Sequence, residues 1–114
     1  MKVVIAGSRN ITDYDLLLKT IADSGFEITE VVSGGAKGVD AMGERYAREN
    51  NIPLTIFKAE WSKYGKGAGP VRNKQMAEYG DALIALMVTD SKGTKNMVIQ
   101  ATKLGLQLHT EVLV

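Results

Sequence analysis

The sequence lacks cysteine and has only two prolines and one histidine. The absence of cysteine excludes disulfide bonds, thiolate catalysis and cysteine-ligated zinc. A cysteine-free chain also fits a reducing compartment, and we expect a cytoplasmic protein. Apolar runs are short as well. The N-terminal run is too short for a signal peptide, and none approaches the roughly 18 apolar residues of a membrane helix. The sequence therefore predicts no membrane partner.

Excess charge of one sign is also missing, since 14 basic residues face 13 acidic ones and the net charge is +1. Such a balance argues against a broad electrostatic surface for duplex DNA or an anionic membrane. A small local anion site needs only backbone amides and one or two cations, so it stays open. A length of 114 residues with 45% hydrophobic residues fits one globular domain over residues 1–114.

Short apolar runs alternate with segments of helical spacing along the whole chain. Strands are predicted over residues 2–6, 30–33, 53–57, 81–87 and 107–114. Helices are predicted from a cap at Thr12 to Gly25, over residues 40–50 and 70–79, and from a cap at Thr94 to Gly105, with a long loop over 58–69. This alternation predicts a doubly wound α/β domain with a five-stranded, mostly parallel sheet and helices on both faces. Our choice of strand order is 3-2-1-4-5.

Loops rich in glycine, hydroxyl groups or basic residues follow the first four predicted strands. In an open parallel sheet these loops meet at one edge, where ligands bind. Glycines let the backbone approach a ligand, and free N–H groups at helix starts favour an anion. The pattern predicts a phosphate- or nucleotide-binding crevice. Its predicted contacts are Gly7, Ser8, Arg9, Ser33, Gly34, Gly35, Ala36, Lys37, Gly38, Asp40, Gly69, Arg72, Asn73, Gly93 and Thr94.

Several of these residues also have a purely structural interpretation. Glycine serves tight turns in any doubly wound protein, and an acid such as Asp40 suits the first turn of a helix. Arg72 is predicted in a first turn too, where the dipole disfavours a cation, so an anionic partner is implied. Trp61 and Tyr64, on the long loop, are candidates to stack on a base or to cover the core or a subunit interface. His109 is expected to be structural or exposed.

Two standard phosphate motifs are absent. There is no GxxxxGK[ST], which excludes a P-loop NTPase. No GxGxxG follows the first predicted strand and no acid ends the second, which argues against a standard dinucleotide dehydrogenase. No residues have metal-ligand spacing, so no metal site is predicted. A Mg²⁺ ion arriving with a nucleotide phosphate is the one cofactor left open.

Four segments resemble the SLOG superfamily, and within it the YspA-like (cpYpsA-related) branch of small proteins from bacteria and phages. They are GSR at residues 7–9, VSGGAKGVD at 32–40, AGPVRNKQM at 68–76 and GTKNM at 93–97. The resemblance extends over nearly the whole chain. It implies a single Rossmann-like domain and a nucleotide-related ligand.

Lonely-guy phosphoribohydrolases show a more distant resemblance. They cleave the N-glycosidic bond of nucleoside monophosphates and carry R-K-x-x-M followed by P-G-G-x-G-T-x-x-E. Residues 72–76 resemble the first motif and residues 93–94 the G-T of the second, whereas Met97 stands at the glutamate position. Glycosidic cleavage normally needs a carboxylate to stabilise an oxocarbenium-like state. The resemblance therefore implies an N-glycosidase only as an alternative, with Arg72 and Asp40 as catalytic candidates.

The DNA-processing protein DprA/Smf also carries G-S-R and S-G-x-A-x-G-I-D, similar to residues 7–9 and 33–40. It binds single-stranded DNA, which usually needs a basic groove with stacking aromatics. Because the net charge is only +1, nucleic acid is the less favoured partner. We expect a small domain that senses or sequesters a nucleotide, with the enzyme and the DNA binder as alternatives. Because small domains of this type tend to pair through exposed helices, a homo-oligomer, dimer or tetramer, is also expected.

Overall fold

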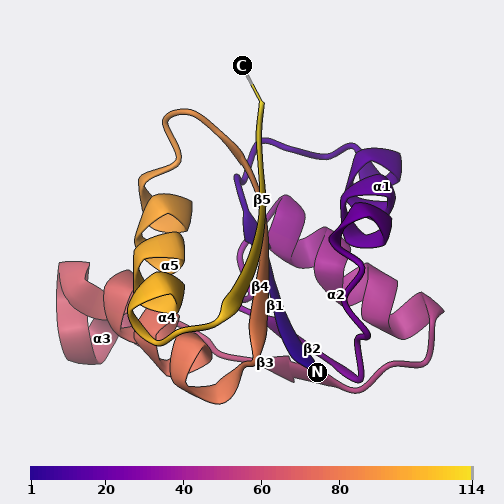
Figure 1. The fold of residues 1–114 in the computed structure, drawn as a ribbon. Coiled ribbons are helices and arrows are strands. Elements are labelled where there is room, and N and C mark those ends of the chain that lie inside the picture. Colours follow the sequence, from indigo (N-terminus) through magenta and orange to yellow (C-terminus); the bar gives the residue numbers. More distant parts are fainter. Residues whose placement is uncertain (114) are drawn as a thin grey trace.

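The computed structural model describes residues 1–113, so Val114, the last residue of the final predicted strand, lies outside the described residues. Strands and helices alternate as predicted (Figure 1). The strands are β1 (Lys2–Gly7), β2 (Glu30–Ser33), β3 (Leu54–Ile56), β4 (Ala82–Val88) and β5 (Gln107–Leu113). The helices are α1 (Tyr14–Ser24), α2 (Val39–Glu49), α3 (Trp61–Tyr64), α4 (Ala68–Tyr79) and α5 (Lys92–Lys103), with a 3₁₀ turn, η1 (Gly65–Gly67), between α3 and α4.

All strand pairs in the sheet are parallel, and the strand order is β3-β2-β1-β4-β5. The predicted fold class and strand order are confirmed. Figure 1 views the sheet edge-on, with α1 and α2 on one face and α3, α4 and α5 on the other. Strand order reverses between β1 and β4. In open α/β sheets the carboxyl edge at such a reversal is where a ligand crevice forms.

Strand β1 divides its side chains between two buried cores. Val3 and Ile5 pack with side chains from α1 and α2, whereas Val4 and Ala6 pack with side chains from α4 and α5. Successive side chains of a strand point to opposite faces, so both faces of the central strands are covered. This explains why β1 and β4 are almost continuously apolar instead of alternating.

Helix α1 starts one residue later than its predicted cap. Asp13, not Thr12, is the N-cap, and its carboxylate accepts a hydrogen bond from the Leu16 N–H at 3.1 Å. An ionised acid satisfies a free N–H group and also interacts favourably with the helix dipole, so it is preferred over threonine. The predicted end is confirmed, since Gly25 takes a left-handed conformation with φ of 69° and donates its N–H to the Ala22 carbonyl.

The segment predicted as a long loop over residues 58–69 contains α3 and η1, and α4 begins at Ala68. Ala68 is buried, which anchors the start of α4 two residues before Pro70. Pro70 still lies in the first turn, where its missing N–H is harmless. Arg72 is therefore the fifth residue of α4, and its predicted place in the first turn is wrong.

Helix α5 also starts earlier than predicted. It begins at Lys92, so Thr94 is its third residue and not its cap. Ser91 occupies the cap position without a side-chain capping bond. Among residues 1–113, no helix is long and apolar enough to cross a membrane.

Candidate functional site

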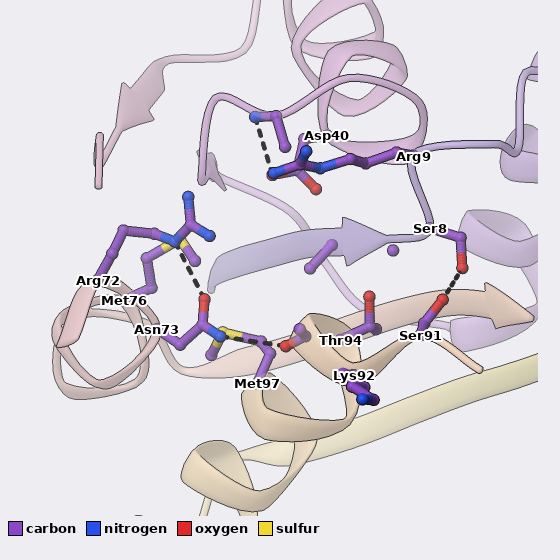
Figure 2. Close-up of a pocket in the computed structure, with 14 residues that line it drawn as sticks. Ser8, Arg9, Asp40, Arg72, Asn73, Met76, Ser91, Lys92, Thr94 and Met97 are labelled. Atoms are coloured by element: carbon purple, nitrogen blue, oxygen red, sulfur yellow. Dashed lines mark hydrogen bonds between the residues drawn. The ribbon is translucent and has the colours of Figure 1, made fainter. Parts of the chain in front are cut away.

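A hollow of about 240 Å³ lies at the carboxyl edge of the sheet, where strand order reverses between β1 and β4 (Figure 2). The end of β1, the loops after β1 and β2 and the start of α2 contribute five of the predicted contacts, Gly7, Ser8, Arg9, Ala36 and Asp40. Helices α4 and α5 contribute four more, Arg72, Asn73, Gly93 and Thr94. The structure thus brings together residues from four separate segments.

A second hollow of about 250 Å³ adjoins the first. Gly34, Gly35 and Trp61 line it, together with Lys58 and Ala59. Arg9, Ala36 and Arg72 line both hollows and form the wall that they share. The predicted crevice is therefore divided into two connected parts.

Some lining residues were not predicted individually. Ala6, Met76 and Met97 form an apolar wall of the first hollow, and Ser91 and Lys92 add polar groups. Ser91 and Lys92 belong to the segment DSKGT at residues 90–94, which follows the fourth predicted strand and whose composition already indicated a ligand edge. The three apolar side chains carry no such signal because they also fit the core beside α4 and α5.

Five predicted contacts line neither hollow: Ser33, Lys37, Gly38, Tyr64 and Gly69. Ser33 is buried at the end of β2. Its hydroxyl donates to a carboxylate oxygen of Glu44 at 2.7 Å and accepts from the Gly35 N–H at 3.1 Å. This arrangement shapes the start of the glycine loop, residues 34–38, from within the protein.

Gly38 holds the glycine loop against the loop that follows β1. Its φ is +72°, and a Cβ added there would lie 2.4 Å from the Ser8 carbonyl oxygen and 2.5 Å from that of Arg9. The N–H of Val39, the first residue of α2, donates to the same Ser8 carbonyl at 3.3 Å. No residue with a side chain can meet both requirements, so glycine at position 38 is needed for packing.

Ser8 ties the end of β1 to the loop after β4. Its buried hydroxyl accepts a 2.9 Å hydrogen bond from the Val88 N–H and is hydrogen-bonded to the hydroxyl of Ser91. Figure 2 shows the two serines joined by this bond among the residues that line the first hollow. The hydroxyl of Ser8 thus positions the start of α5 relative to β1.

The first turn of α5 opens into the first hollow. The first intrahelical bond of α5 runs from the Lys95 N–H to the Ser91 carbonyl at 2.9 Å, and the cap makes no side-chain bond. The N–H groups of Lys92, Gly93 and Thr94 precede that bond and have no acceptor within the helix. The turn contains no acid, and a Cβ added at Gly93 would meet no atom within 4 Å. Free amides and accessible backbone favour a bound anion.

Asn73 fixes that turn from the side of α4. It is 4% exposed, and its amide nitrogen donates to the Gly93 carbonyl at 3.1 Å and to the Asn96 side-chain oxygen at 3.0 Å. Its own side-chain oxygen accepts from Nε of Arg72 at 3.1 Å. Both amide protons are used by the protein, so Asn73 positions the site.

Arg72 and Asp40 approach each other on either side of Gly34. Nη1 of Arg72 donates to the Gly34 carbonyl at 2.6 Å, and a carboxylate oxygen of Asp40 accepts from the Ala36 N–H at 3.3 Å. A Cβ added at Gly34 would lie 2.9 Å from both Arg72 Nη1 and Asp40 Oδ2. The absence of a side chain at Gly34 therefore lets the two charged groups share this space.

Burial is the largest influence on the pKa of both side chains. It raises the pKa of the Asp40 carboxyl above its ordinary value of 3.8, against the hydrogen bond from the Ala36 amide and the charge of Arg72. Burial also lowers the pKa of the Arg72 guanidinium, which Asp40 opposes and Arg9 reinforces. The two residues thus partly compensate each other's desolvation.

The charged lining of the first hollow consists of three cations, Arg9, Arg72 and Lys92, and one carboxylate, Asp40. Figure 2 places Arg9 and Asp40 on one side of the hollow and Lys92 and Thr94 on the other. Residues 1–113 hold no group of three or more histidine, aspartate or glutamate side chains able to bind a metal ion. A Mg²⁺ ion in this hollow would depend mainly on oxygens of the ligand.

Comparison with known proteins agrees with the resemblance seen in the sequence. The model of the YspA, cpYpsA-related SLOG family matches residues 1–64. The Gene 61 protein of Mycobacterium phage D29 is 33% identical over 115 residues, which cover 92% of this chain and 91% of that protein.

Among solved structures, DNA processing protein A (DprA) from Streptococcus pneumoniae superimposes with a TM-score of 0.75 at 19% identity. The match covers 94% of this chain and 48% of that one, so the present chain spans about half the length of DprA. At this identity the likeness concerns the fold alone.

Proposed function

Because the chain belongs to the YspA, cpYpsA-related SLOG family, we propose that it senses or sequesters a nucleotide or nucleotide-derived ligand at the carboxyl edge of its sheet. The proposal rests above all on the first turn of α5. Its amides lack helix acceptors and face a hollow lined by three cations and a single carboxylate. Such a hollow suits a phosphate group.

Arg9 is the cation best placed to neutralise that phosphate. It is exposed, it lines both hollows, and its side chain has no hydrogen-bond or ion-pair partner within residues 1–113. Arg72, by contrast, already donates to Gly34 and Asn73. A charge-assisted bond from a free guanidinium is about twice as strong as a neutral one. Arg9 is therefore the expected main cationic contact, with Lys92 beside it.

The lining favours binding over hydrolysis. Met97 is buried in the wall of the hollow, at the position where the resembling hydrolases carry glutamate. Asp40 is the one carboxylate there, but it is 5% exposed and turned toward the Ala36 amide. A positive charge developing on a sugar would thus lack a free carboxylate.

An N-glycosidase remains the second candidate because of one observation. Asp40 lines the same hollow as Arg72, and burial raises the pKa of its carboxyl, the direction needed for a general acid. Release of free base from a nucleoside monophosphate, lost in Asp40→Asn, would support this activity. Absence of base from every mono- and dinucleotide tested would exclude it.

The test of nucleotide binding is a thermal-shift screen of the whole chain. The panel holds nucleoside mono- and diphosphates, cyclic nucleotides, ADP-ribose derivatives and a short single-stranded oligonucleotide. A ligand that binds only the folded state raises the melting temperature by mass action. The increase should be smaller in Arg9→Ala and unchanged in Arg48→Ala, a control that removes an exposed arginine of α2.

The outcomes of the screen separate the candidates. A nucleotide that stabilises the wild type and has a smaller effect on Arg9→Ala but not on Arg48→Ala supports the proposal. A salt-dependent shift with the oligonucleotide alone would favour a single-strand binder. No shift with any compound at millimolar concentration would contradict nucleotide binding.

A further inference from the structure

The second hollow contains an aromatic side chain that the core does not use. Trp61, the first residue of α3, is 56% exposed and lines this hollow beside Lys58. A Cβ added at Gly69 would lie 3.8 Å from Cη2 of the indole. The ring thus lies against the bare backbone at the start of α4, and a large part of its surface stays open.

The shared wall adds a second kind of base-binding group. Arg9 and Arg72 line both hollows, so their guanidinium groups lie between Trp61 and the first turn of α5. Aromatic rings and guanidinium planes are the groups on which proteins stack nucleobases without sequence preference. Ligand sites for drug-sized molecules occupy roughly 300–1,000 Å³, a range that neither hollow reaches alone.

Building on the proposed function, we propose that one ligand spans both hollows. Its phosphate lies at the first turn of α5 and its base stacks on Trp61. The sugar between them lies over the wall formed by Arg9 and Arg72. The ligand class is then a nucleoside 5′-phosphate or a longer nucleotide. A sugar phosphate would fill only the first hollow.

Trp61 is the one tryptophan of the chain, so its fluorescence reports on this hollow alone. The four ribonucleoside 5′-monophosphates and ribose 5-phosphate are titrated into the wild type, with binding measured in parallel by calorimetry. At least one monophosphate should bind and quench Trp61, whereas ribose 5-phosphate should bind more weakly and leave the emission unchanged.

Matched variants separate stacking from folding. Trp61→Ala should weaken monophosphate binding about 5- to 150-fold, the range expected for loss of one base–aromatic stack. Trp61→Phe should restore most of it. Tyr64→Ala, which truncates an aromatic of the same short helix that lines neither hollow, should have no effect.

The two proposals fail in different ways. Equal binding of ribose 5-phosphate and the monophosphates, with no change in Trp61 emission, would overturn the base site and leave the phosphate site standing. Absence of binding by all five compounds would overturn the two-hollow site for a nucleoside monophosphate, and together with no stabilisation by any compound of the thermal-shift panel it would overturn the proposed function itself.

A separate observation concerns β5, which ends the sheet and has one edge that no described residue pairs with (Figure 1). Two of its apolar side chains, Leu108 and Val112, are 40% and 48% exposed. His109 and Glu111 point to the other face, where Nε2 of His109 is buried without a hydrogen-bond partner among the described residues. It lies 3.6 Å from Oε1 of Glu111. An open edge with exposed apolar side chains is a template for another strand.

The sequence of β5 is complementary to itself around Thr110. In an antiparallel pair related by a two-fold axis at this residue, Leu108 of one copy lies opposite Val112 of the other. His109 likewise lies opposite Glu111. These opposed pairs join apolar to apolar and basic to acidic groups, the combinations that stabilise cross-strand neighbours, whereas Thr110 faces its own copy at the axis and Gln107 lies opposite Leu113 at the ends. From this pattern we infer that the occupant of the β5 edge is a second copy of the chain, which continues the sheet.

The chain has no cysteine, so a single introduced thiol tests this geometry cleanly. Two Thr110→Cys copies would face each other across the axis, where opposed Cα atoms lie about 4.5–5.5 Å apart, within disulfide range. Mild oxidation should convert this variant to a covalent dimer. Gln107→Cys, an exposed control in the same strand whose two copies would be far apart, should stay monomeric on the denaturing gel.

Light scattering on the wild type provides a second test, because it measures the oligomeric state directly. A dimer is expected, and Leu108→Lys should dissociate it while Ile99→Lys, at an exposed apolar position of α5, should not. A monomeric wild type at the highest soluble concentration, or equal crosslinking of the two cysteine variants, would overturn the inference.

Discussion

The guanidinium of Arg72 donates a 2.6 Å hydrogen bond to the carbonyl of Gly34, a residue 38 positions earlier in the chain. The bond joins α4 to the glycine loop and lies where the two hollows meet, because Arg72 lines both. The neighbouring carboxylate of Asp40 is buried as well. Arg72 therefore holds the shared wall together before any ligand arrives.

Arg72→Ala should destabilise the protein. It leaves the buried Gly34 carbonyl without its donor and Asp40 without its compensating charge, which should lower the free energy of unfolding by about 1–3 kcal/mol. Urea denaturation measures the change. Arg48→Ala, on the exposed side of α2, should leave the midpoint unchanged. Equal effects of the two substitutions would contradict the structural role of Arg72.

Gly38→Ala should destabilise the protein more than an alanine placed at a glycine where an added Cβ meets no other atom. The new Cβ would meet the Ser8 carbonyl oxygen at 2.4 Å, at a φ of +72°. Strain and overpacking of this kind cost about 2–4 kcal/mol together. The control is Gly67→Ala, where φ is −81° and no atom lies within 4 Å of the added Cβ. Equal melting temperatures of Gly38→Ala and Gly67→Ala would contradict the close packing of the glycine loop against the loop after β1.

Asp40 should make stability fall as pH rises above the ordinary carboxyl range. Because burial raises its pKa, the folded protein holds this proton to a higher pH than the unfolded chain does. Between 3.8 and the raised value the folded state binds more protons, so the free energy of unfolding decreases with pH and then levels off.

Asp40→Asn removes this contribution while keeping an oxygen that can accept from the Ala36 N–H. The difference in unfolding free energy, wild type minus variant, should therefore fall as pH is raised from about 4 toward neutrality. Urea denaturation at a series of pH values measures it. A difference that stays constant or grows with pH would show that the folded state favours the carboxylate.

Arg9 and Lys37 should contribute differently to ligand affinity. Both are exposed cations on the loops after β1 and β2, but Arg9 lines both hollows and Lys37 lines neither. Losing one charge-assisted bond should weaken nucleotide binding by about tenfold in Arg9→Ala. Lys37→Ala should change it less than twofold. Calorimetric titration with the best ligand of the thermal screen measures both losses of affinity. A larger loss in Lys37→Ala than in Arg9→Ala would place the phosphate at the glycine loop instead.

The sheet was predictable because its physical causes are local in the sequence. The apolar strands β1 and β4 require cover on both faces, which alternating helices supply, and this leads to a mostly parallel five-stranded sheet. The strand order did not follow from the sequence, and the chosen order 3-2-1-4-5 is confirmed by the structure. The start of α4 was missed for a tertiary reason. Ala68 is buried against the rest of the protein, so the helix extends before Pro70 and moves Arg72 out of the first turn.

The sequence predicted the edge of the sheet at which the site lies, but not the shape of the site. The glycine and hydroxyl loops after parallel strands had to meet, and residues from these loops do line one hollow. The division into two hollows depends on the direction of the Arg72 side chain, which its bond to Gly34 sets. Lys58 and Ala59 reach the second hollow because residues beyond β3 turn back toward the glycine loop, and no local pattern encodes that path. Nucleotide binding by the predicted residues stays a prediction.

The most direct test of the account is an amide NMR titration of the ¹⁵N-labelled chain with the ribonucleoside 5′-monophosphates. A phosphate at the first turn of α5 should shift the backbone amides of Gly93 and Thr94 most strongly, because these groups would donate to its oxygens. The indole N–H of Trp61 should shift in the same titration. Unchanged Gly93 and Thr94 amides at saturating nucleotide, or shifts confined to another face, would contradict the central claim.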